Sequence, residues 1–356
     1  MNESINYYIT VDAMCVLSLI ILVHASRRNV FYRDEMKKQF ALAVCLTITV
    51  IMAEIGSVIF ENRMLENLVP VFIVNVTGFS LSPFIAVVLS KAFSAEKGRF
   101  SALLAIPVWL NFAFALSSPW TGSIFYVSDN SYLRGPWFCI YVAAYLCSYA
   151  ILIVESFKAM RLYQCHIKST FVMLLVFTFT GTLVQIMLPD LHTSWLCITL
   201  SLILYYAYIC ELLETQDTLT ELLNRSVYEQ HVNNLKQNAS GSVLMFDLDN
   251  FKQVNDLYGH QWGDFCLQTI GKCIKDCFLH IGFCYRVGGD EFCVICRTTN
   301  EQHLKDALGL FHRKIDDIRK SGDAQNEFPM VSTGYSVFLG LERGYAAAMK
   351  EADTQM

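Results

Sequence analysis

The chain has 356 residues; 54% of them are hydrophobic and only 17% are charged, compared with about 25% charged residues in a typical soluble protein. This composition excludes a disordered chain, a secreted disulfide scaffold and a nucleic-acid-binding protein driven by bulk charge, so no nucleic acid partner is expected. Residues 1–213 hold 13 Lys/Arg and 12 Asp/Glu, whereas the shorter stretch 214–356 holds 14 and 20. The first part is typical of a membrane protein, and the second of an acidic, water-soluble domain.

Seven apolar segments follow one another in the first part. A membrane-spanning helix needs about 20 mostly apolar residues, and in lipid a helix satisfies all its backbone polar groups by itself. We therefore expect an all-α, seven-helix transmembrane bundle over residues 1–208, which contacts membrane lipid and acts as a sensor. The candidate spans are residues 7–26, 39–60, 69–90, 100–118, 136–155, 169–188 and 195–213.

Positive charges alternate between the loops of this region. The loops after the first, third and fifth spans hold eleven Lys or Arg, whereas the loops between them hold two. Loops rich in Lys and Arg stay in the cytoplasm, so the pattern predicts an N-terminus outside and a cytoplasmic second domain. The leader MNESIN carries no positive charge, which favours an uncleaved first helix over a signal peptide.

A few polar residues lie inside the predicted spans, and intramembrane polar residues are candidates for function. The main interpretation is hydrogen bonding between helices; a ligand or ion role for Glu54 is the alternative. The sensory ligand itself is unknown, and the lack of paired intramembrane charges disfavours a transporter. The clearest of these polar residues are Glu54, Asn75, Asn111 and Gln185.

The seventh span runs on without Pro or Gly as far as Asn238. Apolar residues recur there at helical spacing, which predicts a signalling linker helix over residues 209–224 between the membrane and the second domain. A plain spacer is the alternative.

The second domain shows an α+β pattern in the order βαββαβ, with helices covering a sheet. Its predicted strands are residues 242–248, 283–287, 291–296 and 329–338. Its predicted helices are residues 217–236, 252–278, 301–321 and a last one from about 343.

Acidic residues stand at two strand ends of this domain. Asp247 and Asp249 stand at the end of the first strand. Their side chains point to the same side, because side chains alternate along a strand. A two-residue turn at Gly288-Gly289, where glycine permits a positive φ, leads directly into Asp290 and Glu291. If the two strands are neighbours, Asp247 meets Asp290, and a cation between them would favour phosphoryl transfer.

Simpler interpretations of these motifs are a solvated loop for the DxD pair and an ordinary hairpin for GGDE. An EF-hand is excluded, because Phe251 and Lys252 stand where its loop needs a further ligand and a glycine.

Four stretches together resemble the signatures of the GGDEF diguanylate cyclase family, over about residues 217–356. They come in the family's order, and the family fold is similar to nucleotidyl cyclase domains and polymerase palms. The resemblance implies a GGDEF domain in a multi-pass protein of the bacterial inner (cytoplasmic) membrane. The stretches are DTLTELLNR (217–225), DLDNFKQVNDLYGHQWGD (247–264), RVGGDEF (286–292) and VSTGYSVF (331–338).

The resemblance also implies a reaction, in which two GTP give cyclic di-GMP and two pyrophosphates between the facing GGDEF domains of a homodimer. The cofactor would be Mg²⁺, with Mn²⁺ as an alternative. Its ligands would be the carboxylates of Asp247 and Asp290 and the backbone carbonyl of Leu248. Asp290 would help deprotonate the 3′-hydroxyl, and Glu291 would support the same catalytic site.

The remaining residues implied by the resemblance contact the substrate. Asn255 and Asp264 would hydrogen-bond guanine, and Asp264 favours GTP because its carboxylate accepts from the guanine N1–H and N2–H₂ groups. The other substrate-binding residues would be Lys252 at the phosphates, His260 in the pocket, and Gly288 and Gly289 beside the triphosphate.

The sequence departs from the family pattern in three places. Glu221 replaces the usual Gly of the entry motif, and Leu279 and Gly282 replace the RxxD motif of product inhibition. The sequence ends at Met356, before a family segment that supplies a Lys, an Arg and an edge strand, so the resemblance implies a C-terminally truncated domain. The alternative function is a catalytically impaired GGDEF receptor that binds GTP or a protein partner.

Overall fold

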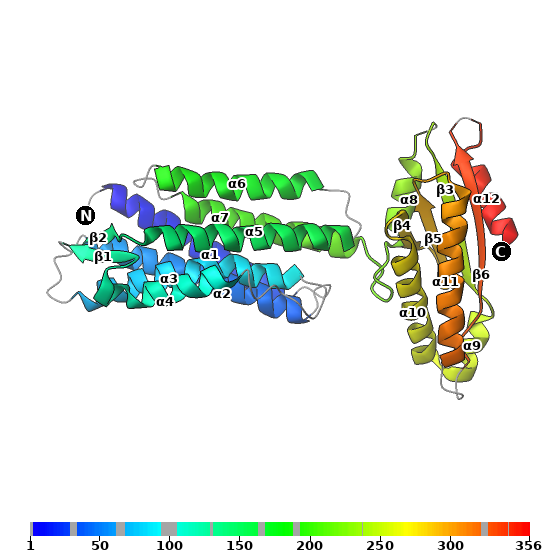
Figure 1. Cartoon of the computed structure of the whole chain (residues 1–356), viewed down its shortest axis with the longest axis horizontal. Helices are drawn as coiled ribbons and strands as arrows, with labels where there is room; N and C mark the ends of the chain where they lie inside the picture. The colour runs from blue at the N-terminus through cyan, green and yellow to red at the C-terminus, as the bar shows by residue number, and fades with distance from the viewer. Residues whose placement is uncertain are drawn as a thin grey trace. The chain divides into compact units, whose positions relative to one another are not determined.

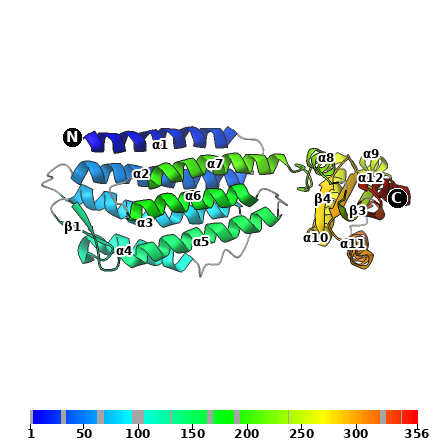
Figure 2. The same cartoon turned by 90° about the horizontal axis from the view of Figure 1, so that it is seen from above.

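The computed structural model describes residues 3–28, 34–61, 68–93, 105–128, 131–162, 168–187, 193–236, 238–321, 327–340 and 342–356. The chain divides into two compact units. The first is Met1–Cys210 without Leu162–Gln164, and the second contains those three residues and Glu211–Met356. Both can be followed by colour in Figures 1 and 2.

The first unit is helical, and each of the seven predicted apolar segments overlaps one of its helices within the described residues. A short hairpin of β1 (Phe125–Ser128) and β2 (Ser131–Arg134) connects the fourth helix to the fifth. The helices are α1 (Glu3–Arg28), α2 (Asp34–Glu61), α3 (Val69–Phe93), α4 (Ile106–Thr121), α5 (Phe138–Leu162), α6 (Lys168–Met187) and α7 (Ser194–Glu214).

Five of these helices are long and apolar enough to cross a membrane within the described part of the chain, namely α1, α2, α3, α5 and α7. Helix α4 has only 16 residues, and α6 contributes a shorter apolar stretch, Val172–Gly181. The structure therefore supports five candidate spans, and the predicted count of seven is not confirmed.

Polar side chains inside the first unit bond from helix to helix. The Asn111 amide donates to the Phe79 carbonyl at 2.8 Å, and the Asn75 amide lies 3.3 Å from the Ser57 hydroxyl. The Trp195 indole N–H of α7 donates to the Glu54 carboxylate of α2. The interpretation as interhelical hydrogen bonds is confirmed for these residues, while the Gln185 side chain lies outside the described set.

Helix α7 ends at Glu214, so the predicted unbroken linker helix over residues 209–224 is wrong. The Asp217 carboxylate accepts hydrogen bonds from the backbone N–H and the hydroxyl of Thr220, and such local bonds compete with a helix. Glu221 then adopts a φ of 59°, in the left-handed region that favours the glycine of the family's entry motif. Helix resumes only at α8 (Arg225–Asn233).

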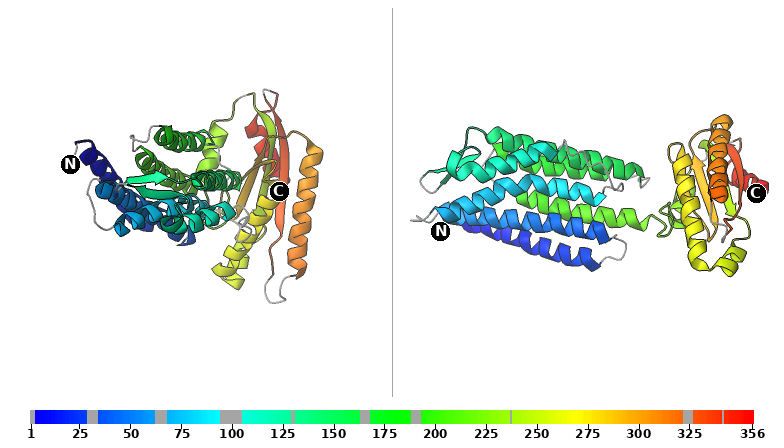
Figure 3. Two further views of the ribbon diagram at one scale, coloured as in Figure 1. Left: turned by 60° about the vertical axis from the view of Figure 1, so that its left-hand side comes forward. Right: turned by 60° about the horizontal axis from the view of Figure 1, so that its bottom comes forward.

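The second unit is built on one antiparallel sheet in the order β4-β5-β3-β6, and the predicted βαββαβ order is confirmed. Figure 3 shows the long helices α10 and α11 lying along one face of this sheet. The strands are β3 (Ser240–Leu248), β4 (Gly282–Arg286), β5 (Glu291–Cys296) and β6 (Val331–Leu339). The further helices are α9 (Phe251–Tyr258), α10 (His260–Phe278), α11 (Glu301–Ser321) and α12 (Tyr345–Gln355).

Alternate residues of β3 fill two separate cores. Leu244, Phe246 and Leu248 pack with buried residues of α10 and α11, whereas Val243 and Met245 pack on the opposite side with residues of α8 and α12. Because both faces are covered, β3 is buried along almost its whole length and holds its C-terminal end in a fixed position.

Candidate active site of the soluble domain

Acidic side chains meet where β3 ends and β5 begins. The antiparallel register places Asp247 opposite Glu291, and Asp290 is the residue just before that strand. The fully buried Phe246 and Phe292 form the next pair along the ladder. Their burial fixes the register, since a slip by one residue would turn these rings toward the other face.

The charges of this cluster oppose one another. Burial, then the nearby carboxylates of Asp290 and Glu291, raise the pKa of Asp247 above its ordinary value. Leu248 is buried and its side chain packs in the core, so that side chain takes no part in the site. A cation beside Asp247 would relieve this repulsion, and Mg²⁺ is commonly held by one or two carboxylates together with substrate phosphates.

Few side chains at this site could act as metal ligands. Among the described residues, no group of three or more His, Cys, Asp or Glu side chains could hold a metal ion. Asp249 accepts a hydrogen bond from the Ser332 hydroxyl at 2.7 Å, and its backbone N–H donates to Met330. Asp249 thereby anchors β6. The chemistry of Asp247, Asp290 and the Leu248 carbonyl suits a divalent ion that completes its shell with substrate oxygens.

The glycine turn differs from the expected one. Four residues, Val287–Asp290, separate β4 from β5, so it is not a two-residue turn. Neither glycine has a φ in the left-handed range. A Cβ on Gly288 would lie 2.5 Å from Glu291 Oε2, so a larger residue there would displace the Glu291 side chain. A Cβ on Gly289 would meet nothing within 4 Å, so a ligand can approach the backbone there.

Arg286 holds this turn in place, a role that the sequence reasoning missed. Its guanidinium donates to the Gly289 carbonyl through Nε and Nη2 and to Asp217 through Nη1 at 3.0 Å. Burial opposes the charge on Asp217, but hydrogen bonds from Thr220 and Arg286 outweigh it and lower the pKa of Asp217. The signal was present in the sequence as an Arg just before the GGDEF motif and an Asp in the entry motif.

The predicted substrate residues other than the two glycines lie on the two helices that follow β3. The helical backbone is interrupted at Gly259, which has a φ of 84°. The predicted single helix 252–278 is therefore two helices, α9 and α10. Asn255 on α9 is half-buried, and a Cβ on Gly263 would overlap its Oδ1. Glycine at 263 therefore lets the Asn255 amide rest against the first turn of α10. Three further predicted residues nearby are exposed: Lys252, His260 and Asp264.

Comparison with known proteins agrees with this arrangement. Residues 214–356 match the family model described as "Diguanylate cyclase, GGDEF domain". Over 84 residues the chain is 42% identical to diguanylate cyclase DgcS of Shewanella oneidensis, covering 22% of this chain and 28% of that protein. Over 145 residues it is 41% identical to the probable diguanylate cyclase DgcJ of Escherichia coli, covering 39% and 26%. The chain therefore carries a GGDEF domain.

The relatives are not all named as cyclases. Cyclic di-GMP phosphodiesterase PdeR of Escherichia coli is 38% identical over 97 residues, which cover 26% of this chain and 15% of that protein. The chain thus spans between 15% and 28% of the lengths of these relatives. Among solved structures, the GGDEF domain of DgcB from Caulobacter crescentus in complex with c-di-GMP is 25% identical. The match covers 39% of this chain and 86% of that one, with a TM-score of 0.35.

Proposed function

We propose that the protein is a membrane-bound, signal-responsive diguanylate cyclase, which condenses two GTP into cyclic di-GMP and two pyrophosphates. The observation that carries this proposal is the register of β3 and β5, which gathers Asp247, Asp290 and Glu291 at one end of the sheet. A structural role alone does not explain such a cluster, because neighbouring carboxylates repel one another and this repulsion opposes folding. Perturbed carboxylates in this position are typical of functional sites.

A divalent cation completes this site in the proposal, and GGDEF diguanylate cyclases generally need divalent metal ions. Asp247, Asp290 and the Leu248 carbonyl would hold it, with Mg²⁺ as the expected ion and Mn²⁺ as an alternative. When bound, the ion supplies positive charge that polarises a phosphoryl oxygen. The protein residues supply the acidic ligands and keep them on a rigid strand end.

The reaction requires two copies of the domain in a homodimer. In each half-reaction the 3′-hydroxyl oxygen of one GTP bonds to the α-phosphorus of the other, and the bond from that phosphorus to pyrophosphate breaks. Asp290 accepts the 3′-hydroxyl proton, with Glu291 beside it. A positioned base of this kind contributes typically 10²–10⁴-fold to a rate.

Guanine is selected by residues of α9 and of the N-terminal part of α10. Asn255 and Asp264 hydrogen-bond the base in the proposal, and the contact of Asn255 with Gly263 fixes the amide. A carboxylate acceptor at Asp264 matches the two donors of the guanine edge. His260 and Lys252 provide further contacts to the nucleotide, and the turn at Gly288 and Gly289 admits the triphosphate.

The first unit provides the membrane location in this proposal. Its apolar helices would cross the bacterial inner membrane in multiple passes, with the N-terminus outside and the GGDEF domain in the cytoplasm. The alternating loop charge supports that orientation. A signal received there would alter the approach of two GGDEF domains.

The experiment is product analysis with the purified, detergent-solubilised full chain, GTP and Mg²⁺. We expect cyclic di-GMP from the native chain, and about 100-fold less from the Asp290→Asn variant, whose side chain keeps its shape but cannot accept the proton. Folding of both is compared by circular dichroism. Equal rates in both proteins, or no product from the native chain, would overturn the proposal.

A further inference from the structure

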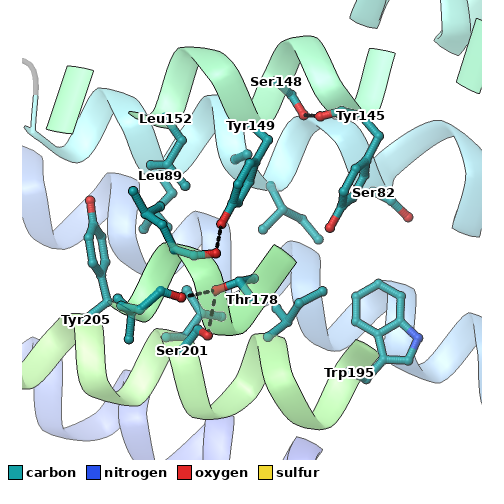
Figure 4. Close-up of a pocket in the computed structure, with 16 residues that line it drawn as sticks. Ser82, Leu89, Tyr145, Ser148, Tyr149, Leu152, Thr178, Trp195, Ser201 and Tyr205 are labelled. Atoms are coloured by element: carbon teal, nitrogen blue, oxygen red, sulfur yellow. Dashed lines mark hydrogen bonds between the residues drawn. The ribbon is translucent and has the colours of Figure 1, made fainter. Parts of the chain in front are cut away.

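A cavity of about 80 Å³ lies inside the first unit, bounded by α3, α5, α6 and α7. Figure 4 shows Tyr149 of α5 extending across it toward Thr178 of α6, with Trp195 of α7 at one end. A cavity of about 150 Å³ holds benzene in another protein. The space here therefore suits a molecule of a few heavy atoms.

The lining of this cavity excludes an ion. None of its 16 lining residues carries a charged side chain, and a charged group in such surroundings would lose its hydration without compensation. Most of the surface is aliphatic or aromatic, but hydroxyl groups come from all four helices, among them Ser82, Tyr149, Thr178 and Ser201. The site thus fits an uncharged, mainly apolar molecule with a small polar end.

The hydroxyl groups also define the polarity of that end. Ser82 donates its hydrogen to the Gly78 carbonyl of its own helix, and Ser148 likewise donates to Tyr145. Tyr149 donates to the Leu175 carbonyl of α6. A hydroxyl group that already donates its hydrogen can still accept a hydrogen bond through its oxygen lone pairs. A molecule that bonds to Ser82, Ser148 or Tyr149 while these bonds persist must therefore donate the hydrogen.

Trp195 connects this cavity with the rest of α7. Its ring lines the cavity, and its N–H is held by Glu54. Ile198, Leu202 and Tyr205 line the same cavity from the same helix, at the spacing of one helical face. The cavity therefore borders α7 over about three turns of the helix.

We infer that this cavity is a binding site for a small, uncharged, mainly apolar molecule that carries one N–H or O–H donor. Ser82 accepts the hydrogen bond, and Trp195 packs against the bound molecule. The inference rests on the proposed function only for its purpose, as the site at which a signal-responsive cyclase receives its signal. Binding itself requires neither GTP nor catalysis.

The test uses pyrrole and furan as probes. Both are uncharged five-membered rings of closely similar size, but pyrrole donates an N–H hydrogen bond and furan does not. Each is titrated into the detergent-solubilised full chain while tryptophan fluorescence is recorded. The Trp195→Phe variant gives the background from the other four tryptophans. We expect a saturable change with pyrrole that disappears in Trp195→Phe.

A matched pair of variants on α3 tests the acceptor. Ser82 lines the cavity, whereas Ser90 is buried on the same helix, donates to its own helix at Val87, and does not line it. We expect Ser82→Ala to weaken pyrrole binding about fivefold, the loss of one hydrogen bond, and Ser90→Ala to leave it unchanged. Furan binding should be the same in both variants.

Two results would overturn the inference: an unsaturable pyrrole titration that is the same in Trp195→Phe, or equal weakening by Ser82→Ala and Ser90→Ala. Failure of the proposed function gives a different pattern. In that case pyrrole would still bind to the native chain and to the Asp290→Asn variant with one affinity, although neither protein would form cyclic di-GMP.

Discussion

Two carboxylates, one in each unit, have opposite surroundings. Glu54 of the first unit accepts a hydrogen bond from the indole N–H of Trp195. Asp247 of the second unit lies beside Asp290 and Glu291, and burial together with these two carboxylates raises its pKa. An apolar interior tolerates a polar group only when it has a partner, so the first arrangement serves stability. The second opposes stability, which is expected where a site is built to bind a cation and phosphates.

The largest expected effect is on catalytic activity, and it distinguishes the Asp247 carboxylate from the Glu54 carboxylate. Asp247→Ala should lower cyclic di-GMP formation by about 100-fold or more, by the loss of a ligand for transition-state charge. The same change should raise the melting temperature slightly, because it removes one of three opposing charges. Activity and thermal unfolding of the full chain measure the two effects.

Asp249→Ala is the matched control for that prediction. Asp249 lies two residues further along and bonds to Ser332 of β6, so its removal should lower the melting temperature. A lower melting temperature for Asp247→Ala as well would show that the cluster is structural, contrary to the comparison.

Glu54 should show the reverse behaviour. Glu54→Ala leaves the Trp195 N–H in the interior of the first unit without this acceptor, and we expect a loss of about 1–3 kcal/mol of unfolding free energy. Glu54→Gln keeps a carbonyl oxygen for the indole and should lose much less. Thermal unfolding in detergent, followed by fluorescence, compares the three proteins. Equal losses in Ala and Gln would instead favour a role for the negative charge.

The Asp217–Arg286 ion pair provides a pH-dependent effect. The pKa of Asp217 is lowered in the folded state, so its contribution is fully present above its ordinary pKa near 4 and is lost as the pH falls below that value. We expect Asp217→Asn to lower stability by about 1–2 kcal/mol at pH 7. The difference from the native chain should stay constant down to about pH 5 and shrink below pH 4. A difference that shrinks already between pH 7 and 6 would contradict this assignment.

The smallest effect concerns Gly263. A Cβ there would overlap Asn255 Oδ1, so Gly263→Ala should move the amide and raise KM for GTP severalfold with little change in kcat. Gly309→Ala on α11 is the control, because a Cβ there meets nothing within 4 Å. That change should leave KM unaltered and stabilise the helix by up to about 1 kcal/mol. An unchanged KM in Gly263→Ala would remove Asn255 from the substrate site.

Much of the second unit could be predicted from the sequence, because local patterns determine it. The continuous apolar run of β3 and the acidic residues that follow it indicated both the strand and the end of the sheet at which the site lies. The helix breaks could not be predicted in this way. The α9–α10 break depends on the backbone at Gly259, and the end of α7 depends on the bonds between Asp217 and Thr220.

Contacts between distant segments were also beyond sequence reasoning. Arg286 reaches Asp217 across 69 positions of the chain, and Trp195 reaches Glu54 across 141. Apolar content predicted seven spans, but helix length and composition support five among the described residues. Such features depend on tertiary packing, which local patterns in a single sequence do not determine.

The most direct test of the central claim is the rate of cyclic di-GMP formation from GTP by the full chain as Mg²⁺ is increased from zero. If Asp247, Asp290 and the Leu248 carbonyl form a site that a cation must complete, product should be absent without divalent ions and rise to saturation with Mg²⁺. Product at the same rate in excess chelator, or none at any Mg²⁺ concentration, would contradict the account.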